Sequence, residues 1–401
     1  MPDTERPSAR SVSMTPSERR AVAGLASVAS VRLLGLFMLL PVLALYANQL
    51  KGATPFLVGL SVGAYGITQA FLQIPFGVAS DRFGRRPVLL VGLAIFAFGG
   101  VVAATADHIG WVIIGRVMQG AGAVSAVLNA LLADLTRDEV RTRAQAIFGA
   151  SIGVSFMLSL MLGPLLADWL GVSGVFWCTV VLATAAFTGV AILAPQQTST
   201  PVRSGAGGWT AVLADQRLRP LFGGIFVLHF LIAAAFVVLP FVLRDRVGLA
   251  PERHATLYLV TMLVAVIIAV ALIGQVERHR APHRFVAFAV ACLVLSQVLF
   301  VLGGPSQVLV AAGLVLMFTG INFLEARLPA EVTLTATADR RGAALGVYAS
   351  AQFVGIFAGG MVAGALLGQF APEAVFAALG GMTALWLVVR LVQPAATRQG
   401  H

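Results

Sequence analysis

Two ionisable side chains lie inside long apolar runs, where they could hold and release a proton. Glu325 lies within the run 306–330 and is the only carboxylate well inside a run of this kind. Asn322, three residues earlier, would share its face if the run is helical. His229 lies within the run 219–243, and an imidazole can titrate near neutral pH. A carboxylate and a histidine so placed predict a proton site, although each could instead be a buried structural residue.

Two arginines lie in apolar runs of the first half of the chain. Arg32 comes about 12 residues into the run 21–47, which is about 18 Å along a helix. Arg116 lies in the run 111–135, with Gln119 three residues later. A charged group at the centre of a membrane costs about 2.5–3.5 kcal/mol, so it should face protein or a watery cavity. Both arginines could line such a cavity; Arg32 could instead be held by backbone carbonyls, and Arg116 could reach the outer surface.

The elements that carry these residues are membrane-spanning helices. Hydrophobic residues make up 58% of the chain and charged residues 11%, whereas a soluble domain carries about 25% charged residues. The mean hydropathy is +0.91. Apolar stretches of about 20 residues predict an all-α membrane protein with transmembrane helices. We expect twelve, at 21–47, 56–80, 87–106, 111–135, 143–167, 172–194, 219–243, 254–275, 284–304, 306–330, 341–368 and 373–393.

Charge and cysteine content exclude several other classes of protein. The net charge of +10 does not indicate nucleic-acid binding, because Lys51 is the only lysine and the arginines are dispersed over short loops. Cys178 and Cys292 lie inside apolar runs, so we expect free thiols and no metal site. The sequence has no phosphate-binding loop and no Ser-His-Asp pattern. We therefore expect no enzyme activity and no cofactor.

The positions of the basic residues orient the chain in the membrane. Twenty of the 27 lysines and arginines fall on the side that holds both termini, and four fall in the opposite loops. Basic loops stay in the cytoplasm, so both termini should be cytoplasmic. Thr15 and Glu18 have the spacing of a helix-capping box. The expected parts are a tail 1–20, a six-helix bundle 21–194, a cytoplasmic linker 195–218, a second bundle 219–393 and a tail 394–401.

The two bundles are related by an internal repeat with an offset of 197 residues. The stretch LLADLT, residues 131–136, matches LPAEVT, residues 328–333, so that Asp134 corresponds to Glu331. The same offset places His229 opposite Arg32. Parallel repeats of this kind form two bundles around a central path, an arrangement that supports alternating access.

The segment GVASDRFGRRP, residues 77–87, is a short charged turn between two apolar runs, so it lies at a membrane surface. Its flanking helices must run antiparallel. Two patterns are present: Gly77, Asp81, Arg82, Gly84, Arg85 and Arg86 fit G-x-x-x-D-R-x-G-R-R, and Arg116, Gln119 and Gly120 fit R-x-x-Q-G. With these patterns the chain resembles the major facilitator superfamily over nearly its full length. NFLEARLP (322–329) and GVYASAQF (346–353) resemble the YajR-type transporters, which are grouped with drug:proton antiporters.

The chain departs from that resemblance in two ways. YajR-type proteins carry a soluble C-terminal domain, which we expect to be missing because the chain stops soon after the twelfth helix. The antiporter signature of the fifth helix is partial: Gly163 and Pro164 are present, but Ala150 and Ser159 stand where the pattern has glycine. Antiport is therefore a weaker prediction than transport.

The resemblance implies a conformational gate and a location. In the resembled family a charge cluster, here Asp81, Arg85 and Asp134, latches the cytoplasmic ends together in the outward-open state; such a turn could also serve only as an anchor. Glycine pairs such as Gly59 and Gly63, or Gly149 and Gly153, are spaced for close helix crossings. The resemblance further implies a monomer in the bacterial inner membrane.

These expectations combine into a hypothesis of function. The chain is predicted to be a secondary transporter that uses the proton gradient to export small amphipathic compounds, with Glu325 as proton acceptor and Arg32 influencing it. The alternatives are a symporter or facilitator of a polar metabolite and, in a different class, a non-transporting membrane sensor or scaffold. The expected partners are lipid, protons and a small-molecule substrate, with no nucleic acid and no metal.

Overall fold

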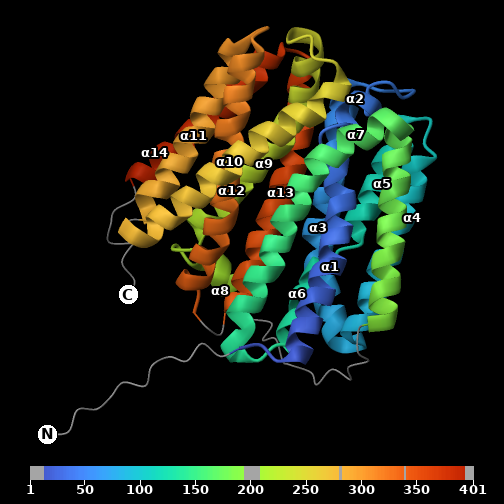
Figure 1. Ribbon diagram of the computed structural model, residues 1–401, viewed down its shortest axis with the longest axis vertical. Coiled ribbons are helices and arrows are strands. Elements are labelled where there is room, and N and C mark those ends of the chain that lie inside the picture. The colour runs from blue at the N-terminus through green and yellow to red at the C-terminus, as the bar shows by residue number, and fades with distance from the viewer. Residues whose placement is uncertain (1–12, 194–207, 280–281, 338–339, 393–401) are drawn as a thin grey trace, which may run out of the picture.

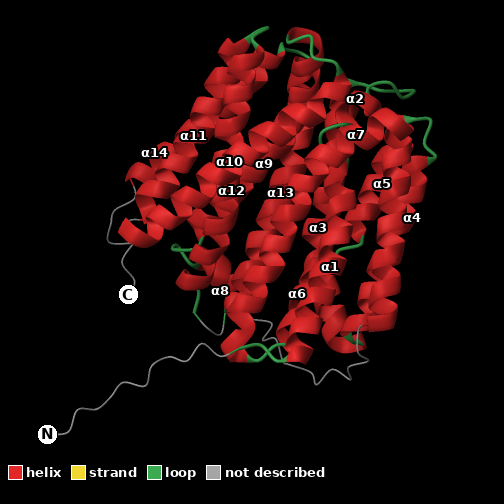
Figure 2. Ribbon diagram, in the orientation of Figure 1, coloured by secondary structure: helices red, strands yellow, loops and turns green. Residues whose placement is uncertain are grey.

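The computed structural model describes residues 13–193, 208–279, 282–337 and 340–392. Figure 2 shows that these residues are nearly all helical. The helices are α1 (Pro16–Met38), α2 (Leu43–Ala47), α3 (Pro55–Phe83), α4 (Arg85–Ala104), α5 (Ile109–Ala121), α6 (Ser125–Asp134), α7 (Asp138–Leu193), α8 (Gly208–Ala214), α9 (Arg219–Phe241), the π-helical turn η1 (Val242–Arg246), α10 (Pro251–His279), α11 (Pro282–Gly303), α12 (Gln307–Thr335), α13 (Arg341–Leu367) and α14 (Pro372–Val392).

Within the described residues, eleven helical segments are long and apolar enough to cross a membrane, rather than the twelve expected. The difference lies in α7, which is broken at Gly171, where φ is 67° and ψ is 169°. A positive φ of this size is readily adopted only by glycine. The chain reverses there, so that α7 forms two antiparallel limbs (Figure 1). The break falls at the boundary expected between the fifth and sixth spans.

The first span differs from the expected continuous helix over 21–47. Helix α1 begins earlier, at Pro16, where Thr15 and Glu18 form the predicted capping box. It ends at Met38, and a short turn over 39–42 leads into α2. Pro41 lies in that turn, where its missing N–H and fixed φ interrupt helical hydrogen bonding. The expected linker 195–218 is described only from residue 208, where α8 begins.

The span expected at 111–135 is also interrupted. Helices α5 and α6 are separated by residues 122–124. A methyl group on Gly122 would lie 2.9 Å from the Cβ atom of Phe96, so only glycine allows α4 to approach this closely. The break leaves the Gly122 carbonyl oxygen outside the regular helical pattern, and that oxygen accepts a hydrogen bond from Arg32.

The two halves of the molecule meet along α3 and α13. Figure 1 shows α13 lying beside the first half of the chain, away from α14. A methyl group on Gly63 would lie 2.8 Å from the carbonyl oxygen of Phe357, and one on Gly360 would lie 2.6 Å from that of Gly59. These glycines therefore form the predicted close crossing. It lies in the half of α3 that begins on the non-cytoplasmic side.

The glycines at the opposite ends of these helices form no such crossing. Gly77 of α3 and Gly342 of α13 have no atom within 4 Å of an added Cβ. Gly149 and Gly153 of α7 also face open space, so the close crossing predicted there is wrong for this conformation. The close glycine contacts between the halves therefore lie at the end of α3 that begins at Pro55.

Candidate proton site and gate

Glu325 lies in α12 and points at a histidine of a neighbouring helix. Its Oε1 atom lies 3.1 Å from Nε2 of His229, which α9 presents. The His229 side chain is 9% exposed, whereas the Glu325 side chain is 39% exposed although it lies well inside a membrane-length helix. Glu325 thus contacts α9, the most buried of the candidate spans, while part of its own side chain stays exposed. A carboxylate that is not fully buried can exchange a proton.

The contacts of His229 fix where its proton is held. Nδ1 lies 3.3 Å from the carbonyl oxygen of Ile225, which can only accept, so Nδ1 carries a hydrogen. Nε2 of the neutral ring is then an acceptor, and the amide nitrogen of Gln352 donates to it at 2.7 Å. Because Nε2 of the neutral ring has one lone pair, it accepts either from Gln352 or from a protonated Glu325 carboxyl group. Protonation of Glu325 would therefore compete with Gln352 for this nitrogen.

Asn322 does not join this pair. Its amide nitrogen donates to the carbonyl oxygen of Phe318 at 2.7 Å and lies 3.3 Å from the sulfur of Met262. Asn322 therefore links α12 to α10 and lies beside the proton pair without contacting Glu325. Gln352, which does contact His229, was missed by the sequence analysis, although GVYASAQF had been singled out as a motif.

Arg32 lies in a polar cluster of the first half rather than beside Glu325. Its guanidinium is 1% exposed. It donates to the Gln69 side chain, the Gly122 carbonyl oxygen and the Ser125 hydroxyl, each at 3.2 Å. It also lies 5.1 Å from the ring centroid of Phe96. Among the described residues, no direct contact between Arg32 and Glu325 supports the expected influence of Arg32 on Glu325. Gln69 is one of two glutamines four residues apart in an apolar run, a signal that could have identified it.

Arg116 and Gln119 are both buried, at 2% and 0% exposure, so Arg116 does not reach the outer surface. Arg116 donates to the Ser61 carbonyl oxygen at 3.3 Å and to the Gln119 side chain at 2.9 Å. Its guanidinium lies 4.5 Å from the ring centroid of Tyr65, within the range of a cation–π contact. The two residues thus act as one polar unit between α5 and α3.

The residues expected to form the gate lie together at the cytoplasmic ends of α3, α4 and α6. Arg85 forms ion pairs with Asp81 and, at 3.0 Å, with Asp134, and it donates to the Ser80 hydroxyl at 2.6 Å. The two carboxylates are 29% and 38% exposed. Exposed pairs of this kind contribute at most about 1 kcal/mol each, so they can open and close reversibly. The cluster exists, while its role as a gate stays a prediction.

The other residues of the turn shape it. Gly84 has a φ of 94°, which favours glycine at the junction between α3 and α4. Arg86 donates to the carbonyl oxygen of Ala191 in the second limb of α7. The Arg82 guanidinium lies 5.5 Å from the ring centroid of Phe83. Gly77 faces open space at the cytoplasmic end of α3.

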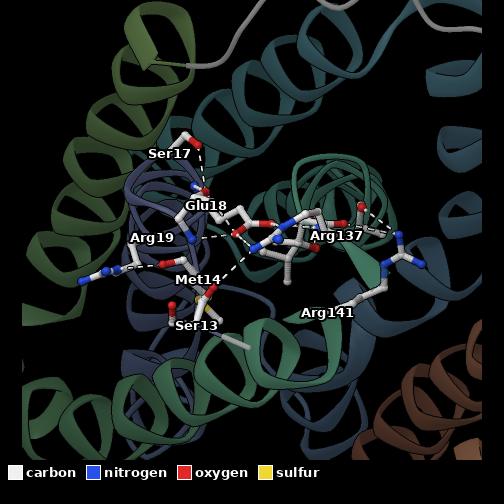
Figure 3. A network of polar contacts seen from close by, with 11 residues as sticks. Ser13, Met14, Ser17, Glu18, Arg19, Arg137 and Arg141 are labelled. Atoms are coloured by element: carbon white, nitrogen blue, oxygen red, sulfur yellow. Dashed lines mark hydrogen bonds and ion pairs between the residues drawn. The ribbon is translucent and has the colours of Figure 1, made fainter. Parts of the chain in front are cut away.

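A second charged network holds the start of α1 against the turn between α6 and α7 (Figure 3). Arg137 forms two hydrogen bonds with the Glu18 carboxylate, at 2.9 and 3.1 Å, and its backbone N–H donates to the same carboxylate at 3.1 Å. It also donates to the Ser13 carbonyl oxygen. The hydrogen bond that Arg137 donates to the Glu18 side chain raises the pKa of Arg137. The capping box indicated that Glu18 was structural, but nothing in the sequence indicated Arg137 as its partner.

Comparisons with known proteins agree with this architecture. The model of the Major Facilitator Superfamily matches residues 25–337. The inner membrane transport protein YajR of Escherichia coli strain K12 is 41% identical over 94% of this chain and 84% of its own length. The multidrug resistance protein MdtH of Klebsiella pneumoniae strain 342 is 26% identical over 88% of this chain and 90% of its own.

Solved structures share the fold at low sequence identity. The crystal structure of the POT family transporter PepTSo superposes with a TM-score of 0.76 at 12% identity, covering 97% of this chain and 100% of that one. At this identity the likeness concerns the fold alone. The family model and the extended match to YajR establish the family: the chain belongs to the Major Facilitator Superfamily and is a membrane transporter.

Proposed function

We propose that the protein uses the proton gradient to export small amphipathic compounds by alternating access. The observation that carries this proposal is the pair formed by Glu325 and His229, with the carboxylate 39% exposed and 3.1 Å from the ring. Open space beside Gly77, Gly149 and Gly342 supports a cytoplasm-open conformation, in which a proton leaving Glu325 would enter the cytoplasm. In exchange, a cytoplasmic compound would enter the space between the halves.

The packing of the halves supports alternation between two states. The outer contact of α3 with α13 includes glycines packed backbone against backbone, with no side chains interlocked at those positions. The cytoplasmic cluster of Asp81, Arg85 and Asp134 would rearrange when the opposite side closes. A transporter needs two states separated by only a few kcal/mol. Weak ion pairs and glycine contacts are consistent with that requirement.

The names of two relatives support the location and the direction of transport. YajR is named as an inner membrane transport protein, and we place this chain in the same membrane with both termini in the cytoplasm. MdtH is named as a multidrug resistance protein, which favours export of amphipathic compounds. At 26% identity this favours a class of substrate and identifies no compound.

Proteoliposomes with an imposed pH gradient test the proposal. Vesicles containing the purified protein and the pH-sensitive dye pyranine receive ethidium or matched neutral and acidic amphipathic compounds. Uptake of a compound should be coupled to proton movement in the opposite direction, and an ionophore that collapses the gradient should stop accumulation. Transport that is indifferent to the gradient, or coupling that survives Glu325→Gln, would reject the proton role.

A further inference from the structure

The first half of the protein contains two buried guanidinium groups that no carboxylate neutralises. Arg32 and Arg116 are 1% and 2% exposed, and among the described residues neither contacts an acidic side chain. Other arginines of the chain do have acidic partners: Arg327, for example, pairs with Glu331 at 3.2 Å. A buried charge is costly unless it is paired, so an unpaired arginine marks a place for a ligand or a mechanism.

The unsatisfied groups in this region are all donors. Arg32 Nε and Gln119 Nε2 are buried and have no hydrogen-bond partner among the described atoms. The orientation of the Gln119 amide is fixed, because its oxygen accepts from Arg116 at 2.9 Å and its nitrogen must point the other way. Two guanidinium groups and two unmatched N–H donors call for an acceptor, and an anion is the acceptor that also neutralises charge.

These groups lie around one aromatic side chain at the moving interface. The Arg116 guanidinium is 4.5 Å from the Tyr65 ring centroid, and both arginines act electrostatically on the Tyr65 hydroxyl. Tyr65 packs edge-on against Phe353 of α13, with ring centroids 6.4 Å apart. Arg32 packs on Phe96, which belongs to the same apolar cluster as Tyr65. The two arginines and the apolar rings thus lie together where the two halves meet.

We propose that Arg32, Arg116 and Gln119 bind the anionic headgroup of the transported compound, which is a carboxylate-bearing amphipathic molecule. Arg32 is the direct ligand, because its unpaired Nε–H can donate one charge-assisted hydrogen bond to a carboxylate. Arg116 adds positive potential, and Tyr65 and Phe353 contact the apolar body. The inference rests on the proposed function, of which it specifies the substrate class.

A purely structural role for the two arginines gives a different expectation. Arg32 satisfies the Gly122 carbonyl oxygen at the break between α5 and α6, and Arg116 satisfies that of Ser61. If these contacts were the whole purpose, the protein would not discriminate among ligands by headgroup charge. The charge preference of binding therefore separates the two explanations.

Binding of three matched compounds tests the proposal. The probes are 4-phenylbutyrate, 4-phenylbutyramide and 4-phenylbutylammonium, which share one apolar body. Their Kd values follow from the concentration dependence of Tm of the purified protein. We expect the carboxylate to bind at least about tenfold more tightly than the amide, because hydrogen bonds to charged groups are the stronger ones. In Arg32→Gln, the Kd values of the carboxylate and the amide should lie within about twofold of each other. Arg116→Gln should reduce the preference for the carboxylate partly.

Arg327→Gln is the matched control, because it removes a guanidinium that already has an acidic partner. It should keep the preference for the carboxylate. If Arg32→Gln does not fold, Arg32→Lys is measured in its place. A reduced preference for the carboxylate over the amide supports the proposal, and an unchanged preference overturns it. Equal binding of the three probes to the wild-type protein would also overturn it. Because binding is measured without a proton gradient, this failure is distinct from failure of proton coupling.

Discussion

Gly364 lies where α13 crosses α3 on the outer side, and its replacement by alanine should drive the halves apart there. The added methyl carbon would lie 2.5 Å from the carbonyl oxygen of Pro55 and 2.9 Å from the Cα atom of Gly59. Real Cβ atoms essentially never approach another atom within 3.0 Å. Both neighbours are backbone atoms, so no side chain can turn away and a helix must shift.

The cost of this shift sets the size of the effect. Overpacking of a close contact costs about 1–3 kcal/mol. The strain exists only while the outer side is closed, so it raises the free energy of the cytoplasm-open state relative to the outward-open state. Since about 1.4 kcal/mol is a tenfold change, the population ratio should move about 5-fold to 150-fold towards the outward-open state.

Distances between spin labels can measure this population. Exposed Thr105 and Gln369 carry the outer pair of labels, and exposed Gln145 and Thr337 carry the cytoplasmic pair. Cys178 and Cys292 are replaced by alanine first, because both are free thiols. Gly364→Ala should lengthen the outer distance and shorten the cytoplasmic one. Gly342→Ala on the same helix has no atom within 4 Å of its methyl group and should leave both distances unchanged.

Unchanged distances in Gly364→Ala would refute the assignment of the glycine crossing to the closed outer side. A similar shift in Gly342→Ala would show that helix propensity, rather than the crossing, controls the equilibrium.

Three further changes test other contacts. Glu18→Gln should lower the Tm of the purified protein, because it removes the charge that binds Arg137. Glu252 lies in the first turn of α10 but is exposed, so Glu252→Gln should leave the Tm unchanged. Equal losses of Tm in the two variants would contradict the role of the network around Glu18 and Arg137. Arg85→Gln should shift the cytoplasmic label distances by a change in population of at most about 25-fold away from the cytoplasm-open state, since the two pairs that it removes are formed in this state and exposed pairs contribute at most about 1 kcal/mol each. A shift the other way would mean that Arg85 stabilises the outward-open state, as a latch does. His229→Gln should change the pH dependence of transport, because it removes the partner of Glu325. His254 is a buried histidine that contacts the Leu249 carbonyl oxygen, and His254→Gln should leave the pH dependence of transport unaltered.

The helical architecture could be predicted from the sequence because it depends on local hydrophobicity. Most expected spans coincide with helices to within a few residues, as for 87–106 and α4 (Arg85–Ala104). The capping box at Thr15 and Glu18 was correct because it involves neighbouring residues. The break at Gly122 was not predicted, because it depends on the approach of α4 and on a hydrogen bond from Arg32, more than 80 residues away in the chain.

The candidate site was predicted in its residue types but not in its pairings. A lone carboxylate in an apolar run led to the prediction of Glu325, and the repeat led to the prediction that His229 lies opposite Arg32. Their contact, and the placement of Arg32 with Gln69 instead of Glu325, depend on how α9, α12 and α1 pack. Sequence spacing within one helix cannot specify which helices face each other. The pairing within the turn 77–87 was easier to predict from the sequence, because Asp81 and Arg85 are one helical turn apart.

In the proposed mechanism, Glu325 carries the proton that drives export. Counterflow in proteoliposomes, which exchanges labelled for unlabelled compound without net proton movement, should continue in Glu325→Gln. Accumulation against a concentration gradient under an imposed pH gradient should be lost. Glu331→Gln, on the same helix but ion-paired with Arg327, should keep gradient-driven accumulation. Accumulation that persists in Glu325→Gln at the wild-type level would contradict the proposed role of Glu325 as the proton carrier.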